Sequence, residues 1–363
     1  MLAIHVLFFV LIRIYNFFAA TIVWVNFMIK NIGRSSFVFE NKPCILGYAA
    51  VVGKKEGEGP LGQEFDEVYN DQLIGQKTWE QAESKLQTLA VEKALMKSKM
   101  KEHDINFIFA GDLLNQCIGS SFGLKSLGIP FAGLYGACST MALSLIMASV
   151  YVSSGCGENA VAVTSSHFCS AERQYRFPLE YGGQRTPTAQ WTVTGSGSAV
   201  VGQYSEKRPY INAASVGEIC DLGVSDANNM GAAMAPAAYS TINNFFNDTK
   251  TKPHDYDMIF TGDLGYIGSE LLYKLFEKDG VNLRKHHLDC GNMIFDKETQ
   301  DVHAGGSGCG CSASVLCSHI LNAMNSGRLR NILFVATGAL MSTTSSYQGE
   351  CIPAVAHLVN IKI

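Results

Sequence analysis

Along most of the chain, apolar and polar residues alternate in the short patterns of an α/β protein. After residue 30, brief β-branched runs and Gly-rich turns separate longer stretches with helical spacing. Trp79 to Lys101 has apolar residues at helical intervals with Glu and Lys between them, which predicts a surface helix. The continuous apolar run Phe107–Ala110 that follows predicts a buried strand.

The first 29 residues have a different pattern. Only five of them are neither apolar nor aromatic, and the sixteen residues 14–29 carry no charge. That length is slightly below the roughly 17–25 residues that cross a bilayer, and Arg13 lies where a longer span would have its centre. Residues 1–30 are therefore interpreted as a hydrophobic extension with three open explanations: a membrane anchor, a mis-assigned start with Met28 as the true initiator, or a buried core segment.

Three elements recur in the same order in the two halves of the chain. The pairs are Phe109-Ala-Gly-Asp-Leu113 with Phe260-Thr-Gly-Asp-Leu264, Gly136-Ala-Cys-Ser139 with Cys309-Gly-Cys-Ser312, and Val161-Ala-Val-Thr164 with Phe334-Val-Ala-Thr337. Cys138 and Thr164 are 26 residues apart, as are Cys311 and Thr337. Matching order and spacing predict an internal duplication.

Each half is predicted to run strand, Gly/Cys loop, buried helix, buried strand. The helices that begin at Ser139 and Ser312 are apolar nearly all round, which indicates burial. The strands are continuous apolar runs, as in sheets that helices cover on both faces. We therefore predict a duplicated α/β fold with α/β/α/β/α layers, in which residues 36–205 and 206–363 form two interlocked halves and the central helices begin near each other.

Composition narrows the classes of function. The 363 residues are 47% hydrophobic and carry 28 Lys+Arg against 32 Asp+Glu, a net charge of −4. These values exclude a disordered chain and a nucleic-acid binder that relies on positive charge. The eleven Cys include no C-x-x-C pair, which argues against zinc and predicts free thiols in a reducing compartment. We predict neither a metal nor a cofactor.

Cys138 is the leading candidate for chemistry where the repeats meet. It stands at a predicted helix start, where unpaired N–H groups and the helix dipole lower a thiol pKa and favour thiolate. An active thiolate also needs a base or an imidazole partner. His167 directly follows a strand and His303 precedes a Gly-rich loop, whereas His287 is expected on the surface. The alternative is that Cys138 is a small core residue.

Arg173, Arg176 and Arg185 lie within 13 positions of one another in a chain with few charges. Guanidinium groups bind carboxylates through paired hydrogen bonds, so these arginines could form an anion cradle. The competing interpretation is a solvated loop in which they pair with Glu172 and Glu180.

Asp112 and Asp263 end the two matching strands. Each could cap the following helix or line a pocket, and capping is the preferred expectation.

The duplicated halves, the Cys that heads the first central helix and the Gly-rich loop that heads the second resemble the thiolase and ketoacyl-synthase superfamily. Gly306-Ser-Gly-Cys-Gly-Cys-Ser-Ala313 is similar to the loop that carries the catalytic His of thiolases, and Ser307 stands at that position. Thr261-Gly-Asp-Leu-Gly265 corresponds to the segment with a His in synthases or an Asn in thiolases, and has neither. The resemblance implies a retained Cys without its catalytic partners.

A denser resemblance, over roughly residues 36–360, is to the family of stage V sporulation protein AD. The motifs that carry it are Gly59-Pro-Leu-Gly62, Ala110-Gly-Asp-Leu-Leu-Asn115, Gly136-Ala-Cys-Ser-Thr140, Thr164-Ser-Ser-His167, Ala171-Glu-Arg173, Glu180-Tyr-Gly-Gly-Gln184, Met234-Ala-Pro-Ala-Ala238 and Ala304-Gly-Gly-Ser-Gly-Cys309. The family implies a component of the SpoVA apparatus, which moves dipicolinic acid into the developing spore of bacteria. Its members bind dipicolinic acid without known chemistry. The first 30 residues have no counterpart there, which favours the mis-assigned start.

Dipicolinic acid is a flat pyridine ring with two carboxylates, so its pocket needs cations or N–H donors and an apolar wall. The two helix starts supply donors and positive dipole ends. The expected ligand-binding residues are Cys138, Ser139, His167, Arg173, Arg176, Asp263, Ser307 and Gly308.

The resemblance thus implies a non-catalytic protein, peripheral to the inner membrane of the spore or forespore. Its expected partners are dipicolinic acid, free or as its calcium chelate, and other SpoVA proteins. By analogy alone, the superfamily also allows a homodimer. The alternatives are an acyltransferase or condensing enzyme that uses Cys138 with His167 or His303 as an unconventional base, and a purely structural scaffold.

Overall fold

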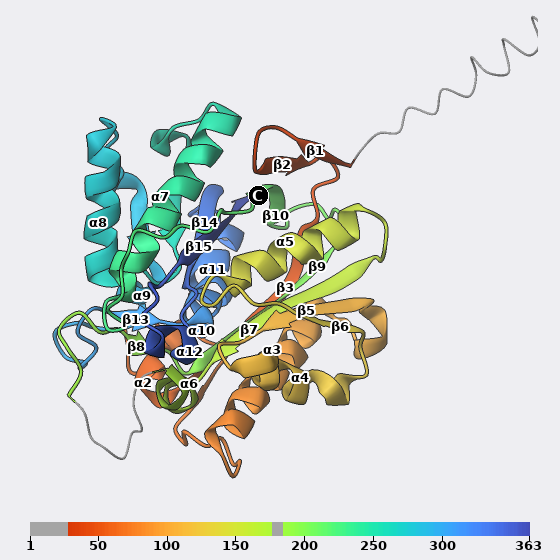
Figure 1. Ribbon diagram of the computed structural model, residues 1–363. Coiled ribbons are helices and arrows are strands. Elements are labelled where there is room, and N and C mark those ends of the chain that lie inside the picture. The colour runs from red at the N-terminus through yellow and green to blue at the C-terminus, as the bar shows by residue number, and fades with distance from the viewer. Residues whose placement is uncertain (1–27, 176–183) are drawn as a thin grey trace, which may run out of the picture.

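The computed structural model describes residues 28–175 and 184–363. A continuous path of ten strands forms its frame, and it consists of two five-stranded parts, called the two sheets below (Figure 1). In spatial order, the first contains β6 (Phe131–Gly133), β5 (Phe107–Gly111), β7 (Asn159–Ser166), β9 (Gly195–Gly202) and β3 (Cys44–Gly53), and the second contains β12 (His287–Asp289), β11 (Met258–Thr261), β14 (Asn331–Ala339), β15 (Ala354–Lys362) and β10 (Tyr210–Ser215). A single residue pair, Tyr210 with Cys44, joins the two sheets.

The strand pairings repeat as the sequence does. β5 runs parallel to β6 and β7, and β7 runs antiparallel to β9. In the second sheet, β11 runs parallel to β12 and β14, and β14 runs antiparallel to β15. The matching orders confirm the predicted duplication of an α/β unit.

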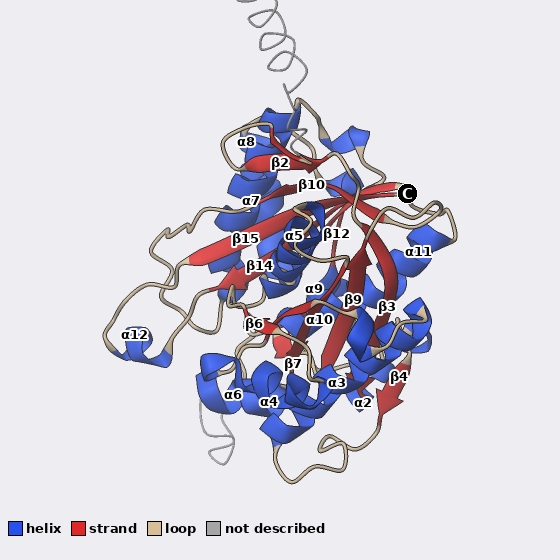
Figure 2. Ribbon diagram, turned by 90° about the vertical axis from the view of Figure 1, so that its right-hand side faces the viewer, coloured by secondary structure: helices blue, strands red, loops and turns tan. Residues whose placement is uncertain are grey.

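Helices form three layers around the sheets (Figure 2). The central layer contains α5 (Thr140–Ser153) and a second continuous helix made of α10 (Cys309–Val315), the π-helical turn Leu316–Ile320 and α11 (Leu321–Asn325). The outer face of the first sheet is covered by α3 (Trp79–Ser98) and α4 (Ile118–Leu124). The outer face of the second sheet is covered by α7 (Met230–Thr249) and α8 (Gly265–Lys278). The central helices contact both sheets, which explains why their sequences are apolar nearly all round. The predicted α/β/α/β/α layering is confirmed.

The predicted helix after Trp79 shows how sequence sets one of these layers. The Thr78 hydroxyl accepts a hydrogen bond from the Gln81 amide at its start, and Lys99 ends it in a left-handed conformation. Its inner face buries Leu86 with the polar Glu83 and Gln87, so α3 is more deeply embedded than a surface helix.

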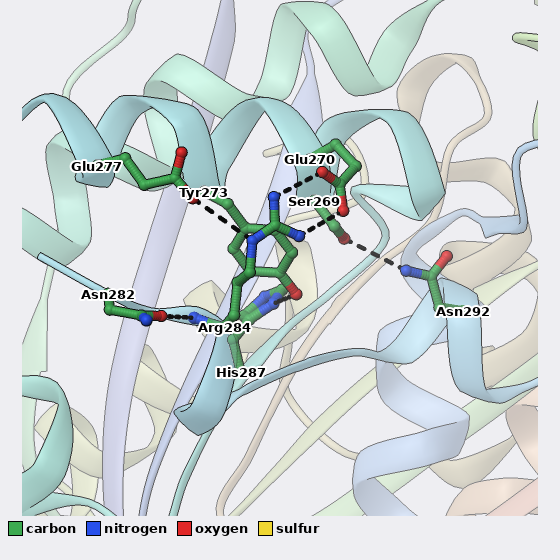
Figure 3. A network of polar contacts seen from close by, with 8 residues as sticks. All are labelled: Ser269, Glu270, Tyr273, Glu277, Asn282, Arg284, His287 and Asn292. Atoms are coloured by element: carbon green, nitrogen blue, oxygen red, sulfur yellow. Dashed lines mark hydrogen bonds and ion pairs between the residues drawn. The ribbon is translucent and has the colours of Figure 1, made fainter.

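Arg284 ties α8 to the edge of the second sheet (Figure 3). Its guanidinium donates two hydrogen bonds to Glu270, at 2.7 and 2.8 Å, and stacks 4.3 Å from the centre of the Tyr273 ring. The Tyr273 hydroxyl meets Nδ1 of His287 at 2.8 Å. His287 is buried, which corrects the expectation of a surface histidine, and burial lowers its pKa to about 3.

Shorter elements complete the fold. They are β1 (Ile29–Asn31), β2 (Ser36–Phe39), β4 (Glu67–Tyr69), β8 (Trp191–Thr192), β13 (Gly306–Ser307), α2 (Lys54–Gly57), α6 (Phe168–Tyr175), α9 (Cys290–Met293) and α12 (Thr343–Tyr347). Across residues 28–175 and 184–363, none of the helices has the length and apolar content of a membrane span. Residues 1–27, on which the anchor and mis-assigned-start explanations rest, lie outside the described residues.

Candidate functional site

The two central helices begin side by side, and Cys138 lies between their starts. The loop before α5 places Ala137 in the left-handed region, with φ 49°, and Cys138 follows with 5% of its surface exposed. Gly308, with φ 105°, precedes α10 in a conformation that glycine adopts without steric cost. Gly338 of β14 packs on the Cys138 loop so closely that a Cβ there would lie 2.2 Å from the Gly136 carbonyl oxygen.

Asp263 is the principal polar partner of this thiol. The Cys138 thiol and the Asp263 carboxylate are buried neighbours, and each affects the pKa of the other. The carboxylate accepts hydrogen bonds from the Gly308 amide at 2.9 Å, the Thr337 hydroxyl at 2.8 Å and the Ser307 hydroxyl at 3.3 Å. Asp263 is therefore a buried partner of the residues around Cys138 and does not cap α8, contrary to the preferred capping expectation.

A third aspartate takes the capping role instead. The Asp289 carboxylate accepts hydrogen bonds from the amides of Leu264 and Gly265 at the start of α8, at 2.8 and 3.0 Å. Asp289 comes from β12, so its position relative to α8 depends on strand pairing and not on local sequence.

Burial and the neighbouring carboxylate raise the pKa of the Cys138 thiol well above its ordinary value. Burial likewise raises the pKa of Asp263, to about 6, against the opposing effect of its hydrogen bonds. At neutral pH the site therefore pairs a protonated thiol with a carboxylate. The prediction that the helix start favours a Cys138 thiolate is wrong, because desolvation and the charge of Asp263 outweigh the helix dipole.

Neither candidate histidine lies beside Cys138. His167 is buried, and its Nε2 lies 2.9 Å from the Gln72 carbonyl oxygen. Its Nδ1 accepts a hydrogen bond from the Cys169 amide. His303 binds the Thr186 carbonyl oxygen through Nδ1, at 2.7 Å. No histidine lines the chamber around Cys138 in the described part of the chain.

The other predicted ligand-binding residues divide into two groups. Ser307 and Gly308 lie with Cys138, as expected, whereas the Ser139 hydroxyl is buried and donates to the Gly136 carbonyl oxygen. Arg173 is directed away: it pairs with Glu80 and lies over the Trp79 ring. Arg176 lies outside the described residues.

Two adjoining chambers lead to Cys138. The inner chamber, about 30 Å³, is lined by Cys138, Ser307 and Glu172 among others. The outer chamber, about 350 Å³, lies between the loop 114–117, the end of α6 and the start of α12. Tyr135, Tyr175 and Met341 line both. Sequence reasoning missed the outer chamber because its walls come from four separate segments that share no motif.

The layered arrangement, with a thiol at the head of a central helix, is a thiolase-like fold. OleA of Xanthomonas campestris has the same fold, with a TM-score of 0.59 and 14% identity over 90% of this chain and 98% of that one. So does 3-oxoacyl-[acyl-carrier-protein] synthase III from Aquifex aeolicus VF5, with a TM-score of 0.55 and 11% identity over 88% of this chain and 100% of that one.

The particular family follows from closer matches. The model of the stage V sporulation protein AD (SpoVAD) family matches residues 33–362. Stage V sporulation protein AD of Bacillus subtilis (strain 168) is 44% identical over 328 residues, which cover 90% of this chain and 96% of that protein. The chain therefore belongs to the family of stage V sporulation protein AD, a family of sporulation proteins.

Proposed function

We propose that this chain is a non-catalytic, dipicolinic acid-binding component of the SpoVA apparatus and serves dipicolinate uptake into the developing spore. The observation that carries the non-catalytic part is the pairing of Cys138 with Asp263. A condensing or acyl-transfer reaction needs a thiolate, whereas the pKa of this thiol is raised and none of the described histidines lines its chamber.

Ligand binding is supported by the cleft that this arrangement leaves in place. Its outer chamber falls within the range of roughly 300–1,000 Å³ typical of small-molecule sites. The walls combine aromatic and aliphatic side chains, including Tyr135 and Leu340, with amide and hydroxyl groups, including Asn115 and Thr343. A planar ring with two carboxylates needs apolar contact on its faces and hydrogen-bond donors at its edge, and such a wall supplies both.

Isothermal titration calorimetry of the whole protein with dipicolinate tests the proposal. Saturable binding at one site per chain is expected. Titration in the presence of a calcium chelator and titration with equimolar calcium distinguish free dipicolinate from its chelate as the ligand. The absence of a binding signal in both titrations would refute the dipicolinate proposal.

The alternative to the non-catalytic function is an acyl-transfer activity of Cys138. Incubation with a radiolabelled acyl-CoA should leave no thioester on Cys138, with the Cys138→Ala protein as the blank. Trapping of a labelled Cys138 peptide would contradict the non-catalytic assignment.

We further propose that the protein works at the inner membrane of the spore as a peripheral subunit held by other SpoVA proteins. Co-purification from sporulating cells under a salt wash and under detergent tests this location. Release by salt alone, together with recovery of SpoVA partners on the tagged protein, is expected; a requirement for detergent in the absence of any SpoVA partner would contradict it.

A further inference from the structure

We propose that Tyr135 and Tyr175 divide the cleft, so that the ligand occupies the outer chamber and never reaches Cys138. This inference rests on the proposed function and adds the position of the ligand and the means by which the thiol is kept apart from it.

The two tyrosines form the partition between the chambers. Their hydroxyl oxygens are 3.2 Å apart, and both side chains, with Met341, line the two chambers. The Tyr175 hydroxyl donates to the Leu113 carbonyl oxygen, so the Tyr135 hydroxyl is the donor within the pair. Two rings fixed by this chain of hydrogen bonds separate the solvent side from the thiol.

The sizes of the chambers decide which one can hold a ring. The volume of about 30 Å³ around Cys138 is less than a tenth of the volume of the outer chamber. The outer volume of about 350 Å³ accommodates a pyridine ring with its two substituents.

The charges of the side chains near Cys138 also favour ligand binding in the outer chamber. The Glu172 carboxyl group lines the inner chamber, and the Asp263 carboxylate lies next to Cys138. A dianion in the inner chamber would therefore be repelled by these carboxyl groups at low dielectric. Among the residues that the structure describes, those that line the outer chamber include no Asp or Glu. A dicarboxylate, or its uncharged calcium chelate, is therefore accepted more readily outside the tyrosine pair.

The wall of the outer chamber also carries unused donors on a strained loop. The side chains of Asn115, Gln116 and Thr343 form no hydrogen bond within the described part of the chain and are available to a ligand. Gln116 and Cys117 are consecutive non-glycine residues in the left-handed region, with φ of 55° and 51°. Such conformations are strained and persist where the surroundings enforce them, commonly at ligand sites.

Each chamber contains a cysteine, and these cysteines report on the inference directly. Cys117 lines the outer chamber and Cys138 the inner one. In the intact protein, iodoacetamide labelling followed by peptide mass spectrometry should modify Cys117 and leave Cys138 unmodified. Dipicolinate at ten times its calorimetric Kd should slow labelling of Cys117 about tenfold, because only the unoccupied fraction reacts. Cys156, exposed at the far end of α5, serves as the internal control and should label at the same rate throughout.

Substitutions of Tyr175 test the partition itself. Tyr175→Ala should open the inner chamber and make Cys138 labelling measurable, whereas Tyr175→Phe, which keeps the ring, should leave Cys138 unmodified. Tyr135→Ala should act as Tyr175→Ala does and supplies a second variant if one fails to fold. Because the raised thiol pKa also slows Cys138, Asp263→Asn with the tyrosines intact is the matched control and should still protect Cys138.

The outcomes separate this inference from the proposed function. Two results would overturn the outer-chamber assignment and leave dipicolinate binding intact. In both, calorimetry detects dipicolinate binding, but dipicolinate slows the labelling of Cys138 in the first and of neither cysteine in the second. Labelling of Cys138 in Asp263→Asn at the rate seen in Tyr175→Ala would show that the tyrosines form no partition. Failure of calorimetric binding would refute the proposed function, while the tyrosine variants would still test the partition.

Discussion

At the scale of single residues, Cys138 shows which of two opposing effects controls a thiol. A helix start stabilises negative charge by about 0.3–1 kcal/mol, and by about 2 kcal/mol in favourable buried cases. Full burial can move a pKa by about 3–5 units, and each unit corresponds to about 1.4 kcal/mol. Burial together with the Asp263 carboxylate therefore prevails, and the thiol pKa rises.

Removal of the Asp263 charge should partly reverse this rise. In the Tyr175→Ala background, where reagent reaches the thiol, Asp263→Asn should lower the Cys138 pKa by about one to three units. The pH dependence of Cys138 carboxymethylation measures it.

The duplicated fold supplies a matched control. Asp112 occupies the equivalent strand end in the first half, and burial together with the Asp112 charge raises the pKa of Cys117. Asp112→Asn should shift the labelling profile of Cys117 and leave that of Cys138 in place. An unchanged Cys138 profile in Asp263→Asn would contradict the electrostatic explanation.

At the scale of elements, close backbone contact fixes the Cys138 loop against the second sheet. The Gly338 position in β14 leaves no room for a side chain, because the nearest atoms belong to the backbone of Gly136 and Ser139. A strand of one half thus determines where the helix start of the other half lies, and this contact brings Cys138 to Asp263.

Gly338→Ala should lower the free energy of unfolding by about 1–3 kcal/mol, because the new Cβ meets backbone that cannot move aside. Equilibrium unfolding in urea measures the loss. Gly133→Ala is the control, since a Cβ in β6 would find its nearest neighbours in ordinary contact at 3.5 Å and should change the unfolding free energy by less than about 0.5 kcal/mol. Equal effects of the two variants would contradict the packing argument.

At the scale of the whole molecule, buried carboxyl groups make stability depend on pH near neutrality. Burial raises the pKa of Glu56 and of Asp289 to about 7. A carboxyl group with a raised pKa in the folded state holds its proton there after the unfolded chain has lost it. Its contribution to the free energy of unfolding is therefore present at low pH and is lost as pH rises through the folded-state pKa.

Between about pH 6.5 and 8 the free energy of unfolding should fall, by about 1 kcal/mol for each of these two groups. The buried histidines His167, His287 and His357 offset part of this fall, by up to about 0.4 kcal/mol each, because burial lowers their pKa while the unfolded forms are still half protonated at about pH 6.5. Burial also raises the pKa of Glu83, which adds to the fall, so the net change remains a decrease. Urea unfolding as a function of pH measures the slope.

Glu56→Gln should reduce that slope, because a neutral amide replaces the titrating group and can keep the hydrogen bond from the Thr194 amide. A free energy of unfolding that stays level or rises from pH 6.5 to 8 would contradict this account of the buried carboxyl groups.

The sequence by itself determined the duplicated fold. Hydrophobic runs and the repeated spacing from Cys138 to Thr164 and from Cys311 to Thr337 are local features, and they fixed the central helices, the strands that follow them and the layered α/β architecture. The same patterns placed Cys138 and Ser307 near one site, because both stand at helix starts that the duplication brings together.

Only the tertiary structure decided the electrostatics and shape of that site. The pKa of Cys138 depends on burial by both sheets and on Asp263, and the cap that Asp263 was expected to form comes from Asp289 on another strand. His287 appeared to belong on the surface because it follows the polar residues Lys285 and His286, and only the packing of the nearby α8, through Tyr273, covers it. The tyrosine partition joins Tyr135 and Tyr175 from segments 40 residues apart in the chain. Pairing between distant segments leaves no local periodicity, so the chain folds around contacts that its sequence pattern does not display.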